Sequence, residues 1–99
     1  METNNLVNKL AFSEDGPVKT PLLQQEHFAL VRIALGKGVT IPPHQGGHAV
    51  FFLVLQGKGI FTHGDKETEL GVNEYLHIGA NETRGIRALD DLVVLVVKH

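Results

Sequence analysis

The stretch of sequence that decides the fold is PPHQGGHAVFFLVLQG, residues 42–57. It places two imidazoles, His44 and His48, directly before an apolar run that ends at Gly57. A short apolar run bounded by glycine is typical of a buried β-strand. Polar groups at the start of such a strand suit a binding site at the mouth of a hydrophobic β-barrel.

Further short apolar runs follow one another along the chain, separated by glycines and by an Asp-Asp pair. No long segment has the 3.6-residue period of an amphipathic helix. Many short strands with regular turns predict an all-β sandwich or barrel. We expect strands at residues 28–35, 49–55, 59–63, 66–70, 74–78, 85–89 and 92–97.

The prolines of the N-terminal part, Pro17 and Pro21, argue against a long helix there. We therefore expect residues 1–24 to form an N-terminal arm or an edge strand. Residues 25–99 are then one barrel domain, which is a suitable size for a single hydrophobic core.

The composition is that of an ordinary soluble domain, and it excludes several kinds of partner. Of the 99 residues, 42% are hydrophobic and 20% are charged, and the formal net charge is -2. This charge provides no attraction to nucleic acid or to anionic lipid, and no apolar run is long enough to cross a bilayer. The chain has no cysteine, which excludes disulfides and thiol chemistry. The first residues lack a secretory signal pattern, so we expect a cytoplasmic protein.

Residues 49–55 and 92–97 are apolar on both alternating faces. One face can fill a barrel, whereas the other needs cover from a second layer or a second chain. We expect a homodimer, with Leu53 and Val94 pointing outward. The alternative is a two-layer sandwich that buries both faces within one chain.

The spacing of glycines around the opening stretch resembles the first motif of the cupin family. Gly38 is followed by five residues and then by His44, and Gly57 lies seven positions after Val50, with six residues between them. Both glycines and the first histidine of the motif are therefore in register.

A second stretch resembles the other cupin motif. Gly71 is followed by five residues and then by His77-Ile78-Gly79, with Glu82 three positions further on. The resemblance covers about residues 25–98 and is that of a small single-domain cupin. It implies a double-stranded β-helix, or jelly-roll barrel.

The two motifs depart from the family at the metal ligands. Cupins that bind a metal usually use two histidines and a glutamate of the first motif and a histidine of the second. This sequence keeps only the first, as His44, and has Gly46, Val50 and Glu82 at the other three positions. The resemblance therefore does not imply the usual site of three histidines and one glutamate.

A rearranged metal site of His44, His48 and Glu82 is the alternative that the residues leave open. Two imidazoles and a carboxylate suit a divalent metal such as iron, zinc or manganese. Four residues of straight strand span about 13 Å, which is too far for both imidazoles to reach one ion. The site therefore requires a bend at residues 46–47, both glycines.

Each of these residues also has a plainer interpretation. His44 can hydrogen-bond to the backbone of its own loop, and His48 beside two glycines can be a solvated loop residue. Glu82 can form a surface ion pair with Arg84 or Arg87, which would contribute little.

Three functions are consistent with the sequence. The first, which we favour, is a binding module that holds a small-molecule ligand inside the barrel and does not require a metal. The second is a metal-dependent enzyme, as the resemblance to cupin dioxygenases and isomerases implies. The third is a structural or interaction barrel without catalysis. The residues expected at the ligand site are His44, His48, Val50, Phe52, Tyr75 and Glu82.

Overall fold

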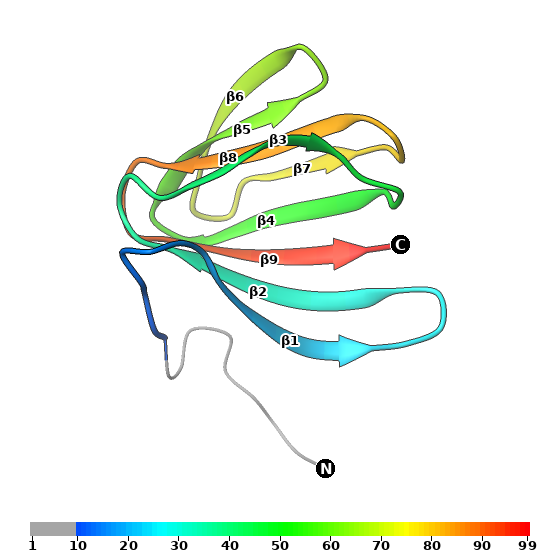
Figure 1. The fold of residues 1–99 in the computed structure, drawn as a ribbon, viewed down its shortest axis with the longest axis horizontal. Helices are drawn as coiled ribbons and strands as arrows, with labels where there is room; N and C mark the ends of the chain where they lie inside the picture. Colours follow the sequence, from blue (N-terminus) through cyan, green and yellow to red (C-terminus); the bar gives the residue numbers. More distant parts are fainter. Residues whose placement is uncertain (1–9) are drawn as a thin grey trace.

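The computed structural model of the protein, described here for residues 10–99, consists of two facing antiparallel sheets (Figure 1). One sheet has five strands in the order β1-β2-β9-β4-β7, and the other has four in the order β3-β8-β5-β6. The all-β, jelly-roll barrel predicted from the sequence is confirmed. The strands are β1 (Val18–Gln24), β2 (Ala29–Leu35), β3 (Thr40–Gln45), β4 (Val50–Gln56), β5 (Lys58–His63), β6 (Lys66–Gly71), β7 (Tyr75–Ile78), β8 (Thr83–Ala88) and β9 (Leu92–Lys98). No helix in residues 10–99 is long and apolar enough to span a membrane.

Strand β3 is not among the strands expected from the sequence, and it contains two consecutive prolines. It lies at the edge of its sheet and pairs only with β8, with a register shift between Ile41 and His44. Proline has no N–H to donate, so it is tolerated at an edge where the ladder is already interrupted. The strand therefore continues past the prolines and carries His44 to one end of the barrel.

Strand β1 forms the edge of the five-stranded sheet and pairs with β2 (Figure 1). It comes from the part of the chain for which an arm or edge strand was expected. Residues 1–9 of that predicted arm lie outside the described residues.

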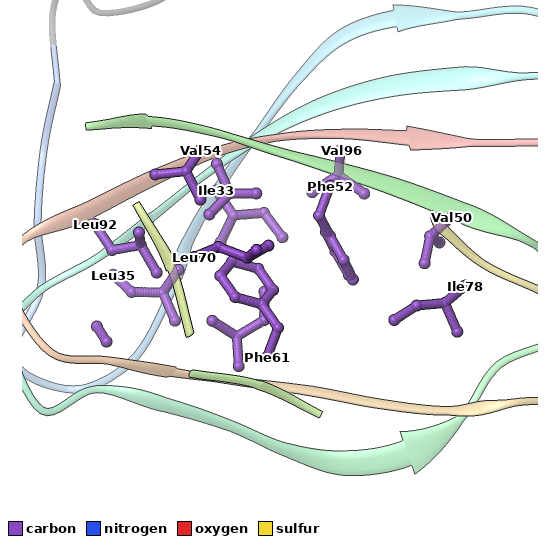
Figure 2. Packing of buried hydrophobic residues seen from close by; sticks show 13 residues of the cluster. Ile33, Leu35, Val50, Phe52, Val54, Phe61, Leu70, Ile78, Leu92 and Val96 are labelled. Carbon is purple, nitrogen blue, oxygen red and sulfur yellow. The ribbon is translucent and has the colours of Figure 1, made fainter. Parts of the chain in front are cut away.

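The hydrophobic core lies between the two sheets (Figure 2). Phe61 is completely buried near its middle, with Leu35 and Leu92 toward one end and Val50 and Ile78 toward the other. Each fully buried side chain of this size stabilises the fold by about 1.5–3 kcal/mol relative to leaving it in water. The core cluster consists of Ile33, Leu35, Val50, Phe52, Val54, Phe61, Leu70, Ile78, Ile86, Ala88, Leu92, Val94 and Val96.

The register of β9 corrects one expectation about the faces of the sheet. Val94 pairs with Val54 and Ile33, which both belong to the core, and it is completely buried. The outward position expected for Val94 is therefore wrong, because alternation along β9 turns its even-numbered residues inward. Leu53 is not a member of the core and pairs with Leu95 and Tyr75. The homodimer expected from these strands stays a prediction.

Candidate functional site

The barrel encloses a cavity of about 150 Å³ that lies between the two sheets. The cavity walls are apolar side chains of the core and of residues packed against it. Imidazoles and cationic side chains also line the cavity. The apolar wall residues are Val31, Ile33, Ile41, Val50, Phe52, Ile86 and Val96. The remaining lining residues are Lys19, His44, Gly46, Gly47, His48, Arg84, Gly85 and Lys98.

Both histidines of the opening stretch line this cavity. His44 stands near the end of β3, and His48 stands in the loop between β3 and β4. The His44 Nδ1 atom lies 3.0 Å from the carbonyl oxygen of Pro42, so its ring also has the local backbone hydrogen bond that we considered from the sequence, although both residues belong to β3 and not to a loop. Both side chains are exposed, as expected of residues at a mouth.

Val50 and Phe52 lie in the cavity wall, on the inward-facing positions of β4. They are 4% and 5% exposed, and the Phe52 ring packs against Phe61 with 5.5 Å between the centroids. The structure thus brings four of the six residues expected at the ligand site to one cavity.

The other two, Tyr75 and Glu82, do not line the cavity, which corrects the predicted placement of both. Tyr75 pairs with Leu53 on the outer face of the sheet, is 66% exposed and packs on Phe51 at 5.2 Å. Two-residue alternation gives the inward positions of β7 to Leu76 and Ile78 instead. The Glu82 side chain is exposed and lies against Gly79.

The rearranged metal site is not assembled in this arrangement. Within the part of the chain that the structure describes, no three His, Asp or Glu side chains come together so that they could hold a metal ion. His44 and His48 share the cavity mouth, but the carboxylate that should complete the set with them does not line the cavity. These donors therefore do not fit an iron, zinc or manganese ion.

A guanidinium group lies next to the position of the second histidine of the first motif. Gly46 holds that position, and a Cβ atom built on it would lie 3.1 Å from the Cζ atom of Arg84. A side chain at residue 46 would therefore press on the guanidinium. The cavity lining therefore has a positive group beside residue 46, the position at which the motif that this sequence resembles usually has a metal ligand.

Backbone carbonyl groups hold Arg84 in place. Its Nη1 atom donates to His48 at 2.6 Å, its Nη2 atom to Gly79 at 3.0 Å and to Glu82 at 3.1 Å, and its Nε atom to Glu82 at 3.2 Å. Arg84 is only 5% exposed. The Glu82 partner is its backbone oxygen, so these bonds are not the side-chain ion pair considered from the sequence.

Sequence reasoning did not place any of the three cationic lining residues, Lys19, Arg84 and Lys98, at the site. A signal existed for Lys98, because it continues the inward alternation of Leu92, Val94 and Val96. Arg84 belongs to no motif, and only the fold brings it beside Gly46.

A second pair of imidazoles lies apart from the cavity. The Nε2 atoms of His77 and His99 are 3.0 Å apart, and their rings lie 5.1 Å apart between centroids. Neither ring lines the cavity. His77, the first residue of the His77-Ile78-Gly79 stretch of the second motif, is thus not part of the cavity lining.

Comparison with known proteins identifies the class to which this barrel belongs. The sequence profile of the cupin domain matches residues 29–98. The chain is therefore a member of the cupin family. A comparison with curated proteins finds no match.

Solved structures agree with this assignment. An RmlC-like cupin protein from Desulfovibrio desulfuricans superimposes with a TM-score of 0.89 at 26% identity, over 99% of this chain and 95% of that one. A protein from Thermus thermophilus superimposes with a TM-score of 0.91 at 23% identity, over 99% of this chain and 96% of that one. KdgF from a Halomonas species superimposes with a TM-score of 0.78 at 19% identity, over 86% of this chain and 80% of that one. At these identities the last two establish only the shared fold.

Proposed function

We propose that the protein binds a small molecule inside the barrel and does so without a metal ion. The observation that carries this proposal is the position of Arg84. Its guanidinium, buried and held by three carbonyl groups, stands beside the residue that replaces a metal ligand of the family. A metal cation beside a fixed guanidinium would be repelled, because like charges in a poorly solvated site interact strongly.

The cavity walls supply the attraction for a ligand. Small-molecule sites are concave, mostly apolar and carry a few polar groups that fix orientation. Here apolar side chains from both sheets surround the space, and His44 and His48 stand at its mouth. A ligand would be held by burial of its apolar surface and oriented by the mouth.

The experiment is a thermal-shift screen of the protein without a histidine tag, in the presence of EDTA, against small organic molecules. A ligand that binds only the folded state raises the melting temperature by mass action. The matched variant is Val50→Phe, which fills the cavity with a larger side chain, and the control is Val72→Phe, the same change at an exposed position. We expect hits in the parent and in the control that disappear in Val50→Phe.

Two results would contradict the proposal. Hits that persist in Val50→Phe would place the ligand outside the cavity. Elemental analysis that finds one metal ion per chain, lost on His44→Ala, would instead favour the enzyme alternative.

A further inference from the structure

The charges around the cavity are all of one sign. Of its fifteen lining residues, Lys19, Arg84 and Lys98 are cationic, and none is Asp or Glu. The chain as a whole has a formal net charge of -2, so this local excess of positive charge runs against the overall balance. A cleft lined by one sign of charge between apolar walls concentrates its field on a ligand of opposite charge.

The two lysines stand at positions where the sheet turns its side chains inward. Lys19 pairs with Ile33 across β1 and β2, and Lys98 pairs with Val50 across β9 and β4. Ile33 and Val50 both belong to the core, and directly paired residues point to the same face of a sheet. Alternation would normally place apolar residues at these two positions. Instead, two lysines stand there, and both line the cavity.

The hydrogen-bond partners of the buried guanidinium within the described part of the chain are all uncharged. All four of its hydrogen bonds end on neutral carbonyl oxygens, and no ion pair between two residues of the range 10–99 involves Arg84, Lys19 or Lys98. A guanidinium carries five N–H donors, so one remains after these four bonds. The positive charge is therefore fixed in position, and no carboxylate among residues 10–99 forms an ion pair with it.

We propose that the ligand of this cavity is a small carboxylate ion with an apolar body, an inference that rests on the function proposed above. The carboxylate faces Arg84 with Lys19 and Lys98 at the rim, and the apolar body lies against Phe52, Val50 and their neighbours. A carboxylate matches the guanidinium as a hydrogen-bond acceptor and as a counter-charge. The cavity of about 150 Å³ is similar in size to one in another protein that admits benzene, so the body is about that large.

The test compares benzoate with benzamide, which has nearly the same shape but no charge, by calorimetric titration of the metal-free protein. We expect benzoate to bind roughly tenfold more tightly or better, because hydrogen bonds to charged groups are the stronger class. The double variant Lys19→Gln/Lys98→Gln should weaken benzoate about fivefold and leave benzamide unchanged. The control Lys37→Gln/Lys66→Gln makes the same change in net charge away from the cavity lining and should leave both affinities unchanged.

The outcomes separate this inference from the proposed function. If benzamide binds as tightly as benzoate, or if only neutral compounds bind, the charge inference is wrong and small-molecule binding stands. Equal losses in the two double variants would also overturn it, because net charge alone would then explain the effect. If inorganic phosphate binds as tightly as benzoate, the apolar body of the ligand does not contribute to affinity and that part of the proposal is wrong. If neither acids nor neutral compounds bind, both proposals fall together.

Discussion

The two ends of the barrel interior are built in different ways. Around Leu35 and Leu92 the side chains are completely buried (Figure 2), and the backbone at Gly57 approaches Asp91 closely. At the end that carries Val50, the interior opens into the cavity, and histidine, lysine and arginine line it together with apolar residues. Close packing at one end stabilises the fold, which leaves the other end free to carry polar groups whose burial contributes less to stability. The same nine strands thus combine a packed core with a site.

The strongest test of the packed end is Gly57→Ala. Gly57 has a φ of 75°, and a Cβ atom there would overlap the carbonyl oxygen of Asp91. Backbone strain and the overlap both act against the folded state, so we expect a loss of at least about 3 kcal/mol in the free energy of unfolding. Urea denaturation followed by circular dichroism measures it.

The control for that variant is Gly64→Ala. Gly64 has a similar φ of 64°, but no atom lies within 4 Å of the place where its Cβ would stand. Only the strain of a positive φ remains, and the free energy of unfolding should fall by between about 1 and 2 kcal/mol. Equal losses in the two variants would show that the close approach to Asp91 does not stabilise the packed end.

A second comparison uses two valines of β4. Val54 is completely buried near the packed end, whereas Val50 borders the cavity. Val54→Ala should lower the free energy of unfolding by about 2–3 kcal/mol, because the lost methyl groups leave a void. Val50→Ala should cost about 1 kcal/mol, because its side chain already faces open space on one side. Losses in the reverse order would contradict the distinction between the two ends.

The sequence predicted the strands of the packed end well, apart from the face of Val94, and the open end only in part. Glycine spacing and apolar runs were sufficient to predict the barrel, because a buried strand needs a regular pattern that stands out in a single chain. The cavity walls Val50 and Phe52 followed from the same pattern. Tyr75 was misplaced because a short strand can be read in either of its two registers, and a shift of one residue exchanges the faces.

The cationic residues of the open end could not be predicted in the same way. Arg84 is held by the backbone carbonyl groups of three separate residues, and no local sequence pattern predicts such hydrogen-bond partners. Glu82 was expected in the site because the motif places a ligand there, yet its side chain does not line the cavity and its backbone oxygen accepts hydrogen bonds from Arg84. Motif register fixes the place of a residue in the chain, whereas the loop conformation decides which of its atoms reaches the site.

The smallest expected effect tests the open end through two neighbouring glycines. At Gly46, a Cβ atom would stand 3.1–3.3 Å from three atoms of the Arg84 guanidinium, whereas at Gly47 it would meet no atom within 4 Å. Gly46→Ala should therefore lower the free energy of unfolding by about 1 kcal/mol, and Gly47→Ala should change it by less than about 0.5 kcal/mol. Urea denaturation of both variants measures the difference.

The cause of that difference can be isolated by repeating both changes in the Arg84→Met background. The methionine side chain has no guanidinium for a new methyl group to displace, so Gly46→Ala should become as mild as Gly47→Ala. The Arg84→Met background itself will be less stable, because the carbonyl oxygens of His48, Gly79 and Glu82 lose their donor. The double-mutant cycle removes this common loss and leaves only the coupling between residues 46 and 84. A difference between the two glycine variants that persists without the guanidinium would show that Gly46 is required by its loop and not by the charged group beside it.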